Sequence, residues 1–169
     1  LDHESKVFIR SLASRDGHGG LSPATPPVAD ILHAFGMDRI LIETVGVGQA
    51  ELDVLLCADL ILLVLQPGTG DVIQSLKAGI LEAADLFLVN KADLPGADNT
   101  ERLLRGMLEL ARPVPHVFRG GENLPPGRPV DEPLPPPSPS WVPPIQRTVA
   151  TQGEGVLELA AAIARHREY

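Results

Sequence analysis

The chain reads Asp85-Leu86-Phe87-Leu88-Val89-Asn90-Lys91-Ala92-Asp93, so that four consecutive apolar residues run directly into a polar turn. Another run, Leu60-Ile61-Leu62-Leu63-Val64-Leu65, is apolar throughout. Apolar runs without alternation are typical of parallel strands that helices cover on both faces, because neither face of such a sheet meets water. The two runs therefore predict an α/β fold, with a mostly parallel sheet and helices on both faces.

Short apolar runs alternate with stretches of helical spacing on both sides of this segment, as expected for strands joined by crossover helices. The pattern predicts strands at Val7–Leu12, Arg39–Thr44, Asp59–Leu65, Asp85–Val89 and Ile145–Ala150. It predicts helices at Pro27–Phe35, Ala50–Ala58, Asp71–Ala84, Thr100–Ala111 and Val156–His166.

Prolines crowd residues 113–144, where no apolar periodicity survives. Proline removes backbone donors and blocks helices, so this stretch is expected to be an extended insertion loop rather than another domain. A PxxP ligand for a partner domain is the alternative, although no basic residue stands beside the prolines as an anchor. Residues 1–169 are therefore expected to form one domain with this loop inside it.

The composition narrows the class of partner. The 169 residues carry a formal net charge of -8, and no basic patch interrupts the acidic balance, which argues against nucleic acid and anionic lipid as ligands. A single cysteine and the absence of a long apolar run favour a cytoplasmic protein that neither crosses nor targets a membrane. The five histidines are scattered without shared spacing, so a zinc site is not expected.

The polar turn after residue 89 carries the strongest chemical signal, because ligands of open parallel sheets bind where the strands end. The Asp93 carboxylate can accept hydrogen bonds from the N1 and exocyclic amino groups of guanine, a pair of donors that adenine lacks. The Asn90 side chain can tie neighbouring loops or meet the base, and the stem of Lys91 can cover the purine face. Downstream, the backbone amide of Ala150 in Thr148-Val149-Ala150-Thr151 can recognise the guanine oxygen. Taken alone, the turn could be structural only, since such turns favour Asn and Asp anyway.

A further candidate site lies in Glu43-Thr44-Val45-Gly46-Val47-Gly48-Gln49, at the end of another predicted strand. Glu43 can hold Mg²⁺ through a water, because this ion keeps part of its hydration shell. A backbone NH at Gly46 can approach a γ-phosphate and order the segment when GTP is bound. The alternative is a plain strand-to-helix turn with an exposed glutamate.

Together these segments resemble the GTPase chaperones of methylmalonyl-CoA mutase, a family of P-loop GTPases. Further matching segments are Val7-Phe8-Ile9-Arg10-Ser11-Leu12-Ala13, Gly19-Gly20-Leu21, Pro67-Gly68-Thr69-Gly70-Asp71, Ile73-Gln74, Lys77-Ala78-Gly79-Ile80 and Pro143-Pro144-Ile145. The resemblance implies GTP or GDP with Mg²⁺ as cofactors, a methylmalonyl-CoA mutase or related cobalamin-dependent mutase as partner, and control of adenosylcobalamin loading. It also implies a switch loop over Pro67–Lys77 that includes Asp71, Gln74 and Lys77, and a homodimer in the longer protein. The alternative for the loop is a simple connection between a strand and a helix.

The departures from this family concern the phosphate site. A P-loop reads Gly-x-x-x-x-Gly-Lys-Ser/Thr, and no such string occurs in these residues. The resemblance places the P-loop upstream of Leu1 and a dimerisation extension beyond Tyr169, so the chain is expected to be an incomplete GTPase domain. Ser14-Arg15-Asp16-Gly17-His18-Gly19-Gly20 also differs from the family's usual Thr-Arg-Gly-x-Leu-Gly-Gly. Two functions stay open: a GTPase that uses these residues, or a truncated or degenerate module that binds a partner without catalysis.

Overall fold

The computed structural model describes residues 7–13, 21–44, 54, 57–68, 80–110 and 141–169. The chain divides into two compact units, Leu1–Asp59 and Leu60–Tyr169. Within the described ranges, no helix is both long and apolar enough to span a membrane.

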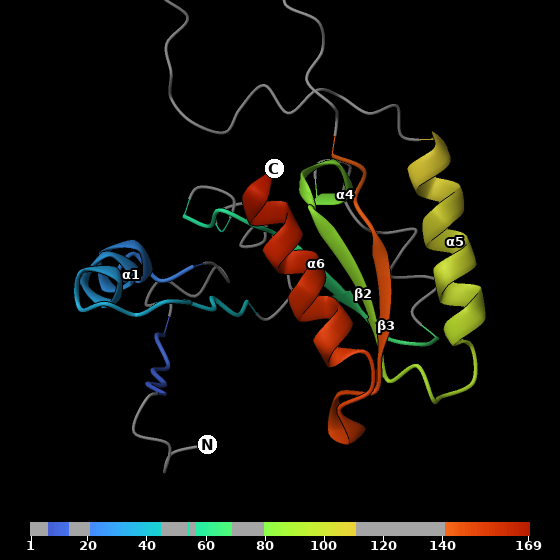
Figure 1. Ribbon diagram of the computed structural model, residues 1–169, viewed down its shortest axis with the longest axis horizontal. Coiled ribbons are helices and arrows are strands. Elements are labelled where there is room, and N and C mark those ends of the chain that lie inside the picture. The colour runs from blue at the N-terminus through green and yellow to red at the C-terminus, as the bar shows by residue number, and fades with distance from the viewer. Residues whose placement is uncertain (1–6, 14–20, 45–53, 55–56, 69–79, 111–140) are drawn as a thin grey trace, which may run out of the picture. The chain divides into compact units, whose positions relative to one another are not determined.

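A three-stranded parallel sheet forms the centre of the second unit (Figure 1). Its strands are β1 (Leu62–Leu65), β2 (Leu86–Asn90) and β3 (Ile145–Thr148), in the spatial order β1-β2-β3. The register pairs Leu65 with Val89 and Asn90 with Thr148. Parallel strands end at the same edge of their sheet, so the residues that follow all three strands gather there. The α/β fold with a parallel sheet is thereby confirmed.

Helices lie on both sides of this sheet. In Figure 1 the sheet stands between α5 (Ala97–Leu110) and α6 (Val156–Glu168), and the short helix α4 (Ile80–Ala83) leads into β2. Successive residues of a strand point to opposite faces. Accordingly, Arg147 reaches α5 with its side chain, whereas its neighbour Thr148 bonds to Asn90. The prediction of helices on both faces is correct.

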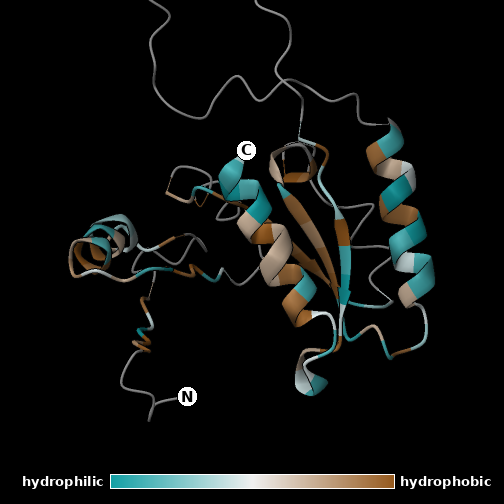
Figure 2. Cartoon of the chain, in the orientation of Figure 1, coloured by the Kyte–Doolittle hydropathy of each residue, from teal (hydrophilic) through white to brown (hydrophobic). Residues whose placement is uncertain are grey.

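The core of the second unit is mostly aliphatic, in line with a chain in which only 4% of the residues are aromatic. Figure 2 shows the hydrophobic colour along β2, whose first four residues are all buried. The largest fully buried side chains all lie on β2 or α5: Phe87, Leu86, Leu104, Val89 and Thr100. Burial of one such large apolar side chain contributes about 1.5–3 kcal/mol. Packing of the buried residues of β2 therefore holds Asn90, its last residue, in place at the end of the sheet.

The first unit contains α1 (Thr25–Ala34), which confirms the helix predicted at Pro27–Phe35 with earlier bounds. Two prolines at its start suit the first turn, where backbone NH groups have no partner within a helix. The strands predicted at Val7–Leu12 and Arg39–Thr44 are wrong, because both segments are irregular. A strand requires a neighbour to hydrogen-bond with, and apolar side chains here stay exposed, with Phe8 at 57% and Leu41 at 93%.

Several element boundaries differ from the sequence pattern. Strand β1 begins at Leu62, α5 begins before Thr100, and β3 ends at Thr148, after which Ala150–Gln152 form the 3-10 helix η2. The predicted helix at Ala50–Ala58 falls largely outside the described residues, and of Asp71–Ala84 only the part from Ile80 is described, where α4 is found. Of the proline-rich stretch 113–144, only 141–144 is described, and these four residues form neither helix nor strand.

Candidate functional site

The turn after β2 presents the predicted base-reading residues. Asn90 is the last residue of β2, and Lys91 follows it with a φ of 57°. The backbone NH of Leu94 donates to the Lys91 carbonyl at 3.0 Å and closes the turn. Helix α5 begins soon afterwards, at Ala97. The turn is thus anchored at one end by a buried strand and at the other by the first turn of α5.

The segment after β3 lies directly beside this turn. The NH of Ala92 donates to the carbonyl of Thr148 at 3.0 Å. The Asn90 Oδ1 atom accepts two hydrogen bonds, from Thr148 Oγ1 at 3.0 Å and from the Ala150 amide at 3.2 Å. Of the two roles that the sequence allows for Asn90, the structure shows the one that ties neighbouring loops. Two segments about sixty residues apart therefore meet at one edge of the sheet.

Asp93 and Thr151 are exposed at this edge. Among the described residues, the Asp93 carboxylate has no recorded hydrogen bond or ion pair. Such a carboxylate can accept two parallel hydrogen bonds from a ligand without first breaking an internal contact. The Lys91 Nζ atom donates to Gln66 Oε1 at 2.8 Å, which brings the residue after β1 to the same edge. Residues that follow all three strands therefore lie at the edge of the sheet where the turn with Asp93 begins.

A tight turn joins β3 to α6. Val149 and Glu154 form an isolated antiparallel bridge, in which the Val149 amide donates to the Glu154 carbonyl at 3.1 Å. Gly155 follows with a φ of 72°, and a Cβ atom built on it would lie 2.1 Å from the Arg147 carbonyl oxygen. Only glycine fits this close approach of two backbone segments. The conformation of the segment around Ala150 thus depends on Gly155, which the sequence pattern identifies only as part of the start of a helix.

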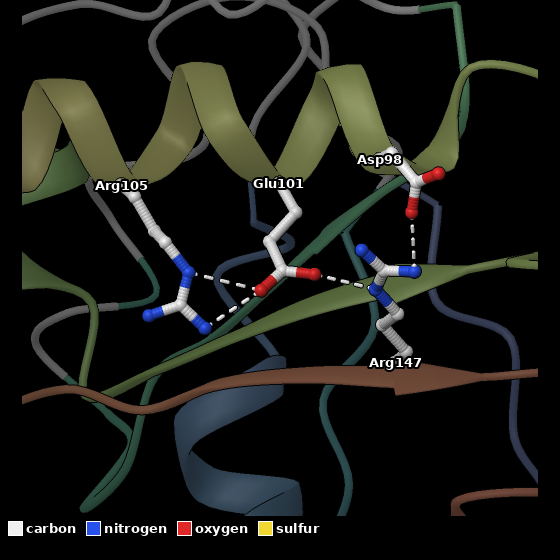
Figure 3. Close-up of polar contacts among 4 residues, drawn as sticks. All are labelled: Asp98, Glu101, Arg105 and Arg147. Carbon is white, nitrogen blue, oxygen red and sulfur yellow. Dashed lines mark hydrogen bonds and ion pairs between the residues drawn. The ribbon is translucent and has the colours of Figure 1, made fainter.

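An ion-pair network joins β3 to α5 on the other face of the sheet (Figure 3). Arg147 Nη1 contacts Asp98 Oδ1 at 2.7 Å, and Arg147 Nε donates to Glu101 Oε2. Arg105, on the same helix, contacts the other Glu101 oxygen at 2.6 Å. Hydrogen bonds from Arg105 and then from Arg147 outweigh partial burial and hold the pKa of Glu101 below its ordinary value. Hydrogen bonds to Asp98 and Glu101 raise the pKa of Arg147.

Replacing Glu101 by glutamine is expected to make the free energy of unfolding depend less on pH in the acidic range. Because the folded pKa of Glu101 is lowered, its carboxylate stabilises the fold fully above the ordinary value of 4.5, and this contribution is lost as pH falls through the lowered pKa. Glu101→Gln should therefore reduce the free energy of unfolding by about 1 kcal/mol at pH 7, with a smaller difference as pH drops below 4.5. Urea unfolding across this pH range measures both values. Glu109→Gln, at an exposed position of the same helix, is the control and should leave the free energy of unfolding at pH 7 almost unchanged. A pH-independent difference between Glu101→Gln and the unmodified protein would contradict the linkage.

The amino-terminal ends of the strands carry a polar cluster that sequence analysis missed. The buried Asp85 accepts the Ile61 amide at 2.7 Å on Oδ2 and contacts His166 Nε2 at 3.2 Å with Oδ1. Trp141 Nε1 donates to the Asp85 carbonyl at 2.7 Å, and its ring meets the His166 ring edge-on at 4.9 Å between centroids. The cluster attaches α6 and Trp141, the first described residue of the proline-rich stretch, to the start of β2. Nothing in the spacing of these residues predicts their meeting, because 24 and 56 positions separate Asp85 from Ile61 and Trp141.

The remaining predicted site residues belong to the first unit or fall outside the described residues. Glu43 is an exposed residue of the first unit. Gly46, Asp71, Gln74 and Lys77 lie outside the described residues. Within the ranges that are described, no three His, Cys, Asp or Glu residues cluster as metal ligands do. The roles predicted for these residues stay predictions.

The chain is similar to a known protein family and to several named proteins. The family model of the methylmalonyl-CoA mutase-associated GTPase MeaB matches residues 1–169. A Pyrococcus horikoshii protein named as a candidate GTPase is 44% identical over 163 residues, which cover 96% of this chain and 45% of that protein. A Mycobacterium tuberculosis protein named a probable GTPase is 35% identical over 162 residues, or 96% of this chain and 42% of that protein. A mouse protein named methylmalonic aciduria type A homolog, mitochondrial, is 39% identical over 93 residues, or 55% of this chain and 22% of that protein. The chain spans less than half the length of these relatives.

Proposed function

The chain belongs to the family of the methylmalonyl-CoA mutase-associated GTPase MeaB, and on this premise we propose that it carries the guanine-recognition part of a GTP-binding and GTP-hydrolysing protein. The partner would be methylmalonyl-CoA mutase or a related cobalamin-dependent mutase. One observation carries the proposal. Asn90 joins the turn after β2 to the segment after β3, so Asp93 and Ala150 stand at the same edge of a parallel sheet.

The edge would supply the groups that distinguish guanine from other bases. The exposed Asp93 carboxylate would accept from the N1 and exocyclic amino groups of the base, and the apolar stem of Lys91 would lie against its face. The Ala150 amide, at 3.2 Å from Asn90 Oδ1, makes a long hydrogen bond and would share its proton with the guanine oxygen. Thr151 follows in η2 and would border the same base. Adenine has an amino group where guanine has this oxygen, so it would leave both Asp93 and Ala150 without good partners.

The remaining parts of the reaction are assigned by the same proposal. The phosphates would be held by a P-loop, a string that these residues do not contain. Mg²⁺, when bound, neutralises charge on the phosphates, and Glu43 would orient one of its waters. Gly46 would sense the γ-phosphate, while Asp71, Gln74 and Lys77 would relay the nucleotide state to the mutase and so control adenosylcobalamin loading. The family resemblance supports these roles and a homodimer of the longer protein, while the cytoplasmic location is proposed from the single cysteine and the lack of a long apolar run.

Discrimination between guanine and adenine tests the proposed function directly. The gene product that contains residues 1–169 should bind a fluorescent GDP analogue with a Kd of about 1 μM or lower. Unlabelled GDP should displace the analogue, whereas ADP should be at least about a hundredfold weaker, because a site built for hydrogen bonds rejects a base that cannot make them. The 169-residue chain is assayed in parallel, to show how much of the affinity these residues supply. Binding of a mutase without any guanine-nucleotide binding would instead favour a non-catalytic interaction module.

A further inference from the structure

The ion-pair network between α5 and β3 connects two elements that each adjoin one segment of the candidate guanine site. Helix α5 begins four residues after Asp93, and its Asp98 and Glu101 lie in the first two turns. Arg147 directly precedes Thr148, whose hydroxyl bonds to Asn90, and it comes three residues before Ala150. Figure 3 shows Arg147 reaching from β3 to both acidic residues of α5. Each end of the network is therefore attached to one of the two segments that would read the base.

We propose that Arg147 and Glu101 are positioning residues for guanine selectivity: by joining β3 to α5, they hold the Asp93 turn against the segment that contains Ala150. This inference rests on the proposed function. On one face of the sheet, Asn90 ties the two segments through its side-chain oxygen. On the other face, Arg147 ties the strand before one segment to the helix after the other. The two ties together restrict both the distance and the tilt of the turn that carries Asp93.

Burial indicates which of the two acidic partners matters more. The Glu101 side chain is 15% exposed, whereas that of Asp98 is 91% exposed. Solvent screens an exposed pair strongly, so the Asp98 contact contributes little. The Glu101 contact is better shielded, and the planar guanidinium of Arg147 fixes its direction. Glu101 is thus the main anchor of the link, although Asp98 is the first cause of the raised pKa of Arg147.

Arg105 provides a matched control, because it has the same charge and contacts the same carboxylate. It lies four residues after Glu101 on α5 and makes no recorded contact with β3 among the described residues. Removal of the Arg105 side chain takes away one ion pair of Glu101, while the contact between Glu101 and Arg147 on β3 remains. A difference between Arg147 and Arg105 variants would therefore report the link itself rather than the loss of one positive charge.

The test compares GDP with inosine diphosphate, which lacks only the exocyclic amino group that Asp93 would bind. Loss of folded protein lowers the apparent affinity for both nucleotides equally. Displacement of the Asp93 turn instead lowers the ratio of GDP affinity to inosine diphosphate affinity. In the gene product that contains residues 1–169, Arg147→Ala should weaken GDP binding about fivefold and inosine diphosphate binding by less than about twofold. Arg147→Lys keeps the positive charge but lacks the planar guanidinium, so it should restore only part of the ratio of GDP affinity to inosine diphosphate affinity. Glu101→Gln keeps a hydrogen-bonding side chain and should lower the ratio without unfolding the protein.

Each outcome of this experiment has a definite meaning. An unchanged ratio of the two affinities in Arg147→Ala and Glu101→Gln, with GDP still bound tightly by the unmodified protein, would overturn the positioning role and leave the proposed function intact. An equal loss of ratio in Arg105→Ala would also overturn it, because the link to β3 would then be irrelevant. Failure of the unmodified protein to distinguish GDP from inosine diphosphate would overturn the proposed function and this inference with it.

Discussion

Asp93→Asn is expected to turn a guanine-binding protein into one that prefers xanthine. Guanine presents two donors, N1–H and the exocyclic amino group, to the carboxylate. Xanthine has a carbonyl oxygen in place of that amino group, so it opposes a carboxylate but matches the amide of asparagine. Hydrogen bonds to a charged group contribute about 1.5–3 kcal/mol each, so loss of one correct pairing should weaken GDP binding by about tenfold to a hundredfold. Xanthosine diphosphate should bind more tightly to the variant by a comparable factor.

The structure makes this exchange a clean test, because Asp93 is exposed and no internal contact of it is recorded within the described ranges. The free energy of unfolding of the variant should therefore lie within about 0.5 kcal/mol of that of the unmodified protein. Asp30→Asn removes the same charge from an exposed position of α1 and should leave both affinities unchanged. Competition titrations with the two diphosphates measure the exchange. Equal loss of both nucleotides, or no change in either, would show that Asp93 does not read the base.

Gly155→Ala is expected to have the largest effect on stability of any single methyl addition in the turn between β3 and α6. The added Cβ would lie 2.1 Å from the Arg147 carbonyl oxygen and 3.2 Å from Thr148 Cγ2, so the backbone itself has to move. A residue other than glycine at a φ of 72° also costs about 1–2 kcal/mol. Overpacking typically adds about 1–3 kcal/mol, so the free energy of unfolding should fall by about 3 kcal/mol or more.

Gly153→Ala separates the two causes, because Gly153 has nearly the same φ, 76°, but nothing lies within 4 Å of its added Cβ. It should lose only the conformational part, about 1–2 kcal/mol. Urea unfolding of both variants and of the unmodified chain gives the comparison. Equal losses would show that the contact with Arg147 relaxes at little cost. A larger loss in Gly155→Ala should be accompanied by weaker GDP binding, since the clash displaces the residues that lead to Ala150.

Local patterns were sufficient for the elements of the second unit. The unbroken apolar runs identify β1 and β2, and the spacing of apolar residues identifies α5 and α6, because such patterns depend on residues only a few positions apart. The same patterns fail at Val7–Leu12 and Arg39–Thr44, which look like strands but are irregular. A strand requires a hydrogen-bonded neighbour, and the presence of a neighbour is a property of the fold rather than of the segment.

The sequence by itself determined the parallel α/β fold, the family, and the place of Asn90, Lys91 and Asp93 at the end of a buried strand. Only the tertiary structure decided that Asn90 ties two loops through its side chain and that Arg147 bridges to Glu101 on the opposite face. These contacts join residues 46 to 60 positions apart, and they exist only because β2 and β3 pair in one register. A shift of that register by one residue would turn Arg147 away from α5 and remove Thr148 from Asn90.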